Sequence, residues 1–416
     1  MSGRGRVAAT VRAIVMAAGV GGVLPPLQAA GPALEGEFAA GLWSSDRRLE
    51  DRSGIASARA RLALDWQVGE GVSVRGEAWA AWGPERLDGR SWDAGLRRLL
   101  VAFDSVPCTP ALGREEILWG RSDGLNPTDQ VSPRNFLRLS PRDRDQRSGR
   151  GGLHLDCMLG EGRFQAHWLG EFHFNDVPLP LPPGVRFRED DADAGADIAM
   201  RYERRGQRLD WALSVLDGHD PYPTLAVRDV RPSGLLLGRD ASPIRMLGGD
   251  AALAIGTAVL RAEVARTWQD GNGRAGSARR PSHTAVVAGA EWFVGDMATF
   301  SVQGFWKHLD GRGGTATVPA RIQQAQGLLA NEVDRNQHGL TLRYARPLWE
   351  SRGDVEVFAV WSRPRDDWML RARLERSLGD RSVLRIGADL FGGPADSYLG
   401  NLRDNCLAVA ELGYAW

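Results

Sequence analysis

Long apolar runs are missing from this chain of 416 residues. Past residue 30 no run reaches the roughly 18 apolar residues that a membrane-spanning helix needs, so such a helix is excluded. No linker or shift in composition divides the chain, which favours one large unit. Lysine is nearly absent, since Lys307 is the only one and the other basic side chains are arginines. The formal net charge of +0 gives no indication of nucleic-acid binding.

Catalytic and metal-binding motifs are also missing. The sequence has no Gly-x-Ser-x-Gly and no His-Glu-x-x-His pattern, and its histidines show no paired spacing. His154, His167 and His173 fall on positions expected to face an interior, where a polar lining is favoured over a metal site. We therefore expect no enzymatic activity, no metal and no cofactor.

Alternation of apolar and polar residues with a period of two is the main pattern that the sequence does contain. Within 57–67 the even positions, among them Leu62 and Leu64, are apolar, whereas the odd positions Ser57, Arg59, Arg61, Asp65 and Gln67 are polar. Each such segment predicts a strand with one apolar and one charged face. Repeated along the chain, the pattern predicts about 18 strands, within a range of about 16 to 18, from 34–44 to 404–416.

The connections between these strands alternate between short and long. Short ones such as Gly206-Gln207 contrast with four long ones. The long connections lie at 122–148, 174–193, 218–243 and 309–334. Outer-membrane barrels show this asymmetry between tight periplasmic turns and extended outer loops. We therefore predict an all-β fold, a transmembrane antiparallel up-and-down β-barrel with both termini on the periplasmic side.

Tryptophan residues gather near the ends of the predicted strands, on the apolar face. Trp66, Trp119 and Trp292 are examples, and this placement is typical of an interfacial girdle. A soluble β-sandwich would instead place its tryptophans in mid-strand. A β-propeller would show a repeat of about 40–45 residues, which the sequence lacks.

The first 30 residues have the three parts of a cleaved signal peptide. Three arginines precede an apolar stretch at 13–24, and the small residues Ala29 and Ala30 follow. We expect 1–30 to be removed after export and 31–416 to form the barrel. A disordered basic tail is the alternative.

The last predicted strand ends in aromatic residues. Leu412, Tyr414 and Trp416 alternate with Glu411 and Gly413. Such an ending resembles the signal by which bacterial outer-membrane β-barrels are recognised for insertion. The resemblance implies a place in the outer membrane of a Gram-negative bacterium, with Tyr414 and Trp416 as targeting residues. It also implies contacts with lipid, lipopolysaccharide and the barrel assembly machinery.

The polar faces of the strands are expected to line a water-filled interior, because a barrel of about 18 strands is wide enough for a channel. The arginines predicted to line it are Arg59, Arg61, Arg75, Arg371, Arg373 and Arg385. Guanidinium groups suit bidentate recognition of carboxylate, phosphate or sulfate. Carboxylates such as Glu375 share this face, so an ion pair that stiffens the wall is the alternative for each arginine.

The segment 113–150 is the most distinctive part of the chain. A strand predicted at 113–121 ends in Trp119-Gly120, and Asn126-Pro127-Thr128-Asp129 then breaks it. This arrangement resembles poorly characterised proteobacterial outer-membrane families in which a GRxxxxWG strand leads into a loop with an Asn-Pro-x-Asp element. Through its strand count and arginine-rich interior the chain is also similar to the alginate exporters. These resemblances imply a channel or an exporter.

The long loop 122–148 follows the fifth predicted strand, the place from which a loop folds into the bore of general porins. Folded inward, it would present an excess of guanidinium groups at a constriction. The arginines concerned are Arg134, Arg138, Arg142 and Arg144. The alternative is a loop that stays outside and pairs with lipopolysaccharide phosphates.

Two functions remain open from the sequence. The first is a porin for passive diffusion of small polar, anionic solutes, which could act as a homo-oligomer. The second is an exporter of an anionic polysaccharide or other polymer, which would need periplasmic partners.

The three cysteines allow one disulfide. Cys108 and Cys157 lie near the predicted periplasmic end, where an oxidising compartment favours a bridge. Cys157 faces lipid by the alternation, so geometry decides whether the bridge forms.

Overall fold

The computed structural model describes most of the chain. The described residues are 31–45, 53–83, 91–138, 140–177, 185–188, 194–232, 234–269, 276–278, 280–295, 297–311 and 318–416. The signal peptide predicted at 1–30 lies outside them.

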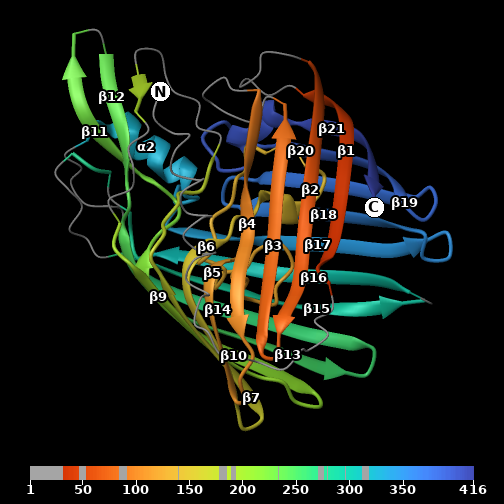
Figure 1. Cartoon of the computed structure of the whole chain (residues 1–416). Helices are drawn as coiled ribbons and strands as arrows, with labels where there is room; N and C mark the ends of the chain where they lie inside the picture. Colours follow the sequence, from red (N-terminus) through yellow and green to blue (C-terminus); the bar gives the residue numbers. More distant parts are fainter. Residues whose placement is uncertain are drawn as a thin grey trace, which may run out of the picture.

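Eighteen strands of the described residues form one antiparallel sheet (Figure 1). They are β1 Ala33–Ser45, β2 Gly54–Gly69, β3 Val72–Trp82, β4 Trp92–Phe103, β5 Cys108–Glu115, β6 Arg150–Leu159, β7 Gly162–Leu169, β9 Asp197–Arg204, β10 Leu209–His219, β13 Pro243–Ile255, β14 Ala258–Gln269, β15 His283–Val294, β16 Ala298–Leu309, β17 Asn336–Leu348, β18 Gly353–Arg363, β19 Asp367–Ser377, β20 Ser382–Gly392 and β21 Leu407–Ala415. The sheet closes on itself because β1 pairs with β21, with Phe38 opposite Tyr414. The predicted barrel of 18 strands is confirmed.

Side chains alternate between the two faces of the barrel wall, as the period of two predicts. On β1, Leu42 is 70% exposed on the outside, whereas its neighbour Trp43 is 4% exposed on the inside. Large apolar side chains are exposed in the same way on strands all round the barrel. A continuous apolar outer face suits a lipid surrounding, so the barrel is a transmembrane one. None of the helices in the described residues has the length and apolar character needed to cross a membrane.

The fifth strand lies earlier than the sequence predicts. It spans Cys108–Glu115, whereas 113–121 was expected. Ile117 and Trp119 extend the apolar alternation beyond it, but both are buried inside the barrel. Trp119 is only 3% exposed, so its predicted place in a lipid-facing girdle is wrong. An alternating segment that packs against the inner wall therefore looks like a strand in the sequence.

The earlier start of β5 brings two cysteines together. Cys108 lies directly opposite Cys157 on β6, and the two form a disulfide. Cys406 is not part of this bridge. The bridge ties together the ends of β5 and β6 that lie opposite the long segment joining these strands.

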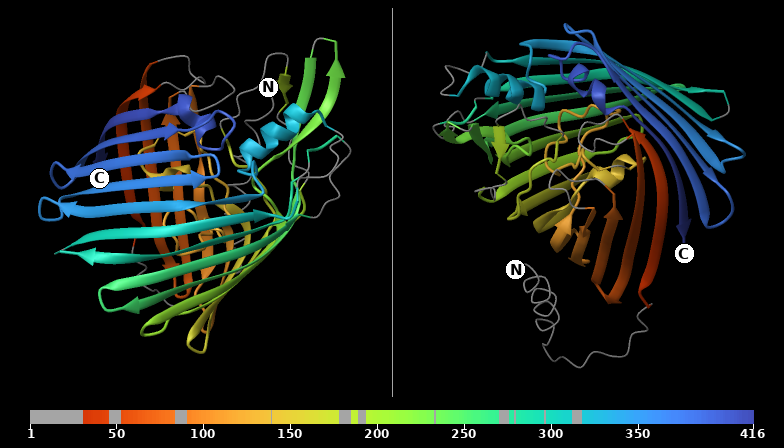
Figure 2. Two further views of the ribbon diagram at one scale, coloured as in Figure 1. Left: turned by 180° about the vertical axis from the view of Figure 1, so that it is seen from behind. Right: turned by 90° about the horizontal axis from the view of Figure 1, so that it is seen from above.

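Further elements, which the sequence analysis did not predict, gather at the end of the barrel that carries the long connections (Figure 2). They are the three-stranded sheet of β8 Val185–Phe187, β11 Thr224–Arg231 and β12 Gly234–Asp240, the helix α2 Ala320–Leu329 and the 3-10 turn η2 Gly400–Asn405. Another 3-10 turn, η1 Asp143–Gln146, lies inside the barrel. Helix α2 packs on the sheet through Ile322 and Leu225. The buried Gln326 accepts a hydrogen bond from the Leu225 backbone N–H at 2.7 Å and donates one to the Pro223 carbonyl at 3.2 Å.

Candidate functional site

Residues 116–149, which join β5 to β6, contact inward-facing side chains on distant strands. We refer to them as the inner loop. Near its beginning, Asp123 accepts a hydrogen bond from Ser301 on β16 at 2.7 Å. Towards its end, Arg142 pairs with Glu37 on β1 at 2.7 Å. The ring order of the strands separates β16 widely from β1, so the inner loop crosses the interior (Figure 2).

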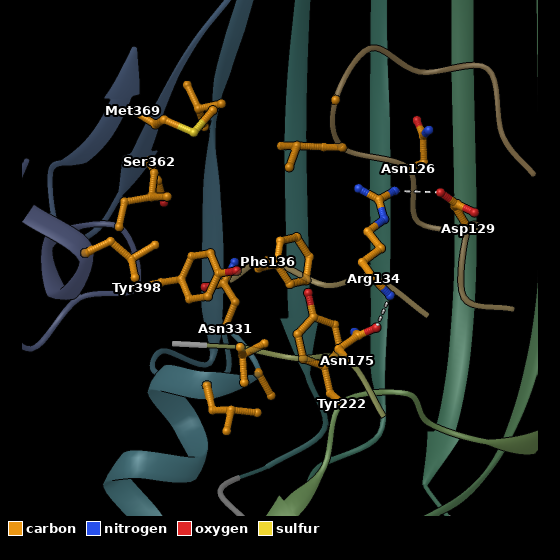
Figure 3. Close-up of a pocket in the computed structure, with 18 of the residues that line it drawn as sticks. Asn126, Asp129, Arg134, Phe136, Asn175, Tyr222, Asn331, Ser362, Met369 and Tyr398 are labelled. Carbon is orange, nitrogen blue, oxygen red and sulfur yellow. Dashed lines mark hydrogen bonds and ion pairs between the residues drawn. The ribbon is translucent and has the colours of Figure 1, made fainter. Parts of the chain in front are cut away.

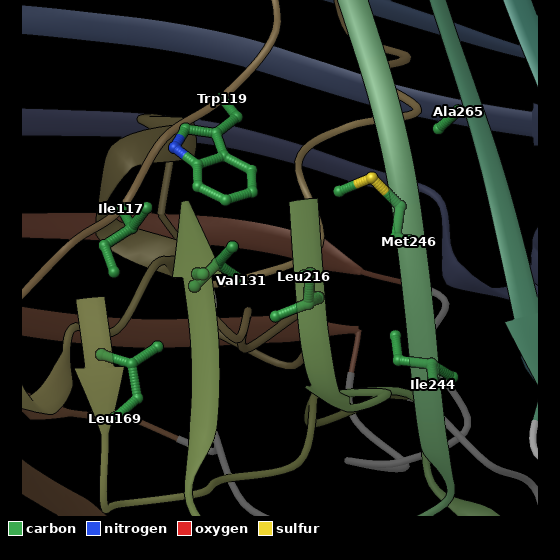
Figure 4. Packing of buried hydrophobic residues seen from close by; sticks show 9 residues of the cluster. Ile117, Trp119, Val131, Leu169, Leu216, Ile244, Met246 and Ala265 are labelled. Atoms are coloured by element: carbon green, nitrogen blue, oxygen red, sulfur yellow. The ribbon is translucent and has the colours of Figure 1, made fainter. Parts of the chain in front are cut away.

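An apolar cluster fixes the first part of the inner loop (Figure 4). Ile117, Trp119 and Val131 pack against the inner wall. The wall residues of this cluster are Leu169, Ala199, Leu216, Ile244, Met246 and Ala265, on strands β7 to β14. The interior is therefore apolar on this side, where a polar lining was expected on nearly every strand.

A buried carboxylate next to this cluster binds the loop backbone. Glu263 on β14 accepts hydrogen bonds from the backbone N–H and the hydroxyl of Thr128, each at 2.8 Å. Its other oxygen accepts backbone N–H groups of Arg121 and Ser122 at 3.1 and 3.3 Å. Gly120 has a φ of +91°, and a Cβ there would lie 2.7 Å from both Glu263 oxygens. The last glycine of the GRxxxxWG pattern thus permits a close approach that other residues would block.

Asp129 joins the two arms of the inner loop near its middle. Its Oδ2 atom pairs with the guanidinium groups of Arg134 and Arg147, each at 2.6 Å. The backbone N–H of Asn135 donates to the Gln146 carbonyl at 2.6 Å, so the two arms of the loop lie side by side. Arg134 also donates its backbone N–H to the Asn175 side chain at 2.8 Å, which links the inner loop to the next long connection.

The far end of the inner loop is organised around Asp145. This buried carboxylate forms ion pairs with Arg59 on β2 and, at 3.1 Å, with Arg142. The Ser140 hydroxyl donates to it at 2.6 Å, and Arg97 on β4 lies 3.4 Å away. Burial would raise the pKa of Asp145, but the guanidinium groups of Arg59 and Arg142 outweigh it and hold the pKa well below its ordinary value.

Most of the arginines predicted to line the pore are engaged in ion pairs with carboxylates. Arg385 pairs with Glu37 and Glu375 at 2.8 Å and with Glu411 at 3.1 Å. Among the predicted arginines, Arg59, Arg61, Arg134, Arg142, Arg144, Arg371, Arg373 and Arg385 each pair with at least one carboxylate. Their positive charge is therefore balanced locally.

Arg371 and Arg373 connect the inner loop to β19 and β20. Both pair with Asp389, at 2.8 Å each. Arg371 also pairs with Asp143 of the inner loop, and Arg373 donates to the Pro141 carbonyl at 3.0 Å. These contacts hold the inner loop at a third place on the wall.

The remaining predicted residues occupy different surroundings. Arg138 is buried, and its guanidinium carbon lies 3.6 Å from the centre of the Trp79 ring. Arg75 is exposed. Tyr414 and Trp416 are exposed on the outer face of the last strand, where their targeting role stays a prediction.

A cavity of about 1000 Å³ lies between the inner loop and strands β15 to β20, with α2 and η2 on its rim (Figure 3). Among the described residues that line it, seven carry a positive charge and seven a negative one. The positive ones are Arg134, Arg138, Arg280, Lys307, Arg321, Arg343 and Arg371. The negative ones are Asp123, Asp129, Asp143, Asp220, Glu356, Asp367 and Asp389. The cavity thus combines many charged groups, which balance in number, with a lining that is otherwise largely apolar.

Several lining residues were not singled out in the sequence. Phe136, Tyr222 and Tyr398 reach the cavity from three different connections. Arg321 and Gln324 reach it from α2. In the sequence, the only sign of these lining residues is that aromatic and amide residues occur within the long connections. The fold of the connections is what brings them together.

Two of the three histidines predicted to face the interior form a pair, whereas His173 is exposed and contacts Glu171. The Nδ1 atoms of His154 and His167 are 2.9 Å apart, and both side chains are buried. In the described part of the chain, no group of three or more His, Cys, Asp or Glu side chains is arranged to hold a metal ion.

The barrel fold is similar to solved structures, although no family model and no curated protein matches the sequence. OccK1 (OpdK) of Pseudomonas aeruginosa has a TM-score of 0.59 at 12% identity, covering 92% of this chain and 98% of that one. OccAB1 of Acinetobacter baumannii has a TM-score of 0.59 at 10% identity, covering 94% and 98%. OprD of P. aeruginosa has a TM-score of 0.57 at 12% identity, covering 94% and 97%. These similarities show the fold of the chain.

Proposed function

We propose that this chain is an outer-membrane channel through which small polar solutes diffuse. The supporting observation is the inner loop, which crosses the interior of a closed transmembrane barrel beside a cavity of about 1000 Å³ that carries fourteen charged side chains. A barrel with 18 strands leaves an aqueous lumen unless a segment fills it. The inner loop narrows that lumen, and solutes pass between it and strands β15 to β20. The same barrel type is characteristic of Gram-negative outer membranes.

The sequence indicates a preference for anions, but we expect this preference of the channel to be weak. Fixed charges around a pore set ion preference, and here positive and negative side chains balance in number. Arg321 on α2 is exposed at the cavity and has no ion-pair partner among the described residues. We assign the anion preference to Arg321, because it is available to an entering anion.

Replacing this arginine tests the assignment. Arg321→Gln is expected to move the reversal potential of a channel in a salt gradient towards the value of a non-selective pore. The expected change is small, because one exposed charge is screened over about 8–10 Å at physiological salt. Arg205→Gln, in the turn between β9 and β10, is the matched control and should leave the reversal potential unchanged. An equal shift in both variants would contradict the assignment.

Polymer export is the less favoured alternative. An inner loop held by β14, β16, β19 and β1 obstructs a wide path through the barrel. Single-channel recording in planar bilayers tests the channel directly. Discrete conductance steps are expected, and a purified, folded barrel that produces none would contradict the proposed function.

A further inference from the structure

The cavity is rich in neutral groups that donate and accept hydrogen bonds. Five carboxamide side chains line it without a hydrogen-bond partner among the described residues. They are Gln146, Gln324, Asn331, Asn401 and Asn405. Each carboxamide offers two N–H donors and a carbonyl acceptor, so it suits a partner that also does both. A hydroxyl group has that character, whereas a carboxylate only accepts.

Aromatic rings occupy the same cavity (Figure 3). Phe136 comes from the inner loop, Tyr222 from the connection after β10 and Tyr398 from the connection after β20. Tyr222 and Tyr398 line the same part of the cavity. Burial raises the pKa of Tyr222, and the neighbouring Tyr222 together with burial raises that of Tyr398. Both phenols therefore stay neutral and combine an apolar ring with a polar tip.

The charged groups beside these rings are already paired with one another. Arg134 is bound to Asp129, and Arg343 pairs with Glu356 at 2.6 Å. At Arg134 and Arg343 a free anion would have to displace a carboxylate from the guanidinium, which leaves a partly buried charge without its partner. Among the described residues that line the cavity, only Arg321, away from these pairs on α2, is open to an anion. A neutral solute with hydroxyl groups needs no such exchange, because it can add hydrogen bonds to the existing pairs.

We propose that this cavity binds neutral, hydroxyl-rich ring compounds, with saccharides as the chemical class. The apolar C–H faces of such rings pack on Phe136, Tyr222 and Tyr398, while the hydroxyls bond to the carboxamides. The inference rests on the proposed function, since it names the solute that crosses the channel. It assigns recognition to the outer end of the cavity, where α2 and the long connections meet.

The test combines channel recording with direct binding. Cellobiose is the probe, and tetraethylene glycol is a neutral control without the ring and its hydroxyls. Cellobiose is expected to interrupt the current and to give saturation-transfer NMR signals with the full-length barrel in detergent. Tyr398→Phe and Gln324→Ala should each raise the half-blocking concentration about 3- to 10-fold, the loss of one hydrogen bond. Tyr344→Phe, on the outer face of β17, is the matched control and should leave it unchanged.

The outcomes separate the inference from the channel function. If the barrel conducts but cellobiose neither blocks it nor binds, the saccharide site is overturned and the channel stands. If it does not conduct but cellobiose binds and Tyr398→Phe weakens binding, the site stands and the channel falls. Equal effects of cellobiose and tetraethylene glycol, or of Tyr398→Phe and Tyr344→Phe, would overturn the site, as would a stronger block by succinate.

Discussion

Removing the Glu263 carboxylate is expected to open the channel. In the Glu263→Ala variant, the N–H groups of 121, 122 and 128 and the Thr128 hydroxyl lose their acceptor. Each donor left unpaired in a buried place costs about 1–3 kcal/mol. The start of the inner loop should therefore leave the wall, and the single-channel conductance should rise roughly twofold or more as the narrowest section widens.

A matched substitution separates loop release from the loss of a charge. Glu375→Ala removes a carboxylate from β19 whose side chain is 41% exposed and whose partner is Arg385. It lies away from the Glu263 anchor, so conductance should stay close to that of the unchanged protein. Unchanged conductance in Glu263→Ala, with the variant correctly folded, would show that the apolar cluster alone holds the loop.

The barrel could be predicted from the sequence because its wall obeys a single physical rule. Lipid on one side and water or polar groups on the other impose a period of two, as in 57–67, where Leu62 and Arg61 face opposite ways. The rule fails where a segment packs inside the barrel. Ile117 and Trp119 alternate like strand residues, yet they face an apolar part of the inner wall. Alternation of apolar and polar residues shows that the two faces of a segment have different surroundings. It does not show what those surroundings are.

The arrangement of the candidate site could be predicted only in part. The sequence identified Arg59, Arg142 and Arg371 as interior residues, but their carboxylate partners lie far away in the chain. Local pattern carries no information on such pairs, because they depend on strand order and on the path of the inner loop. Tyr222 and Tyr398 likewise line one cavity only because the fold brings two distant connections together. Charge balance in the cavity is therefore a property of the fold, and a count of arginines could not reveal it.

Replacing Asp145 with alanine is expected to release the other end of the inner loop. Asp145 is buried, and removing it leaves Arg59 and Arg142 without the carboxylate that they share. Breaking a buried ion pair on one side costs about 3–5 kcal/mol. Because the inner loop is rich in arginine, trypsin should cut it in the variant roughly 100-fold faster than in the unchanged protein, in which the docked loop is protected. Asp380→Ala, in a turn at the opposite end of the barrel, is the control.

The pH dependence of docking follows from the same carboxylate. A carboxyl group whose pKa is lowered on folding stabilises the folded state fully above its ordinary value of 3.8, and the contribution is lost as the pH falls through the lowered value. The loop should therefore stay docked from neutral pH down to about pH 4, and the conductance should not step up over that interval. A step near pH 5 in the unchanged protein that is absent from Asp145→Ala would mean that the pKa of Asp145 lies above its ordinary value of 3.8 and is not lowered by its arginines. The ion pairs with Arg59 and Arg142 would then contribute little to holding the loop across the barrel.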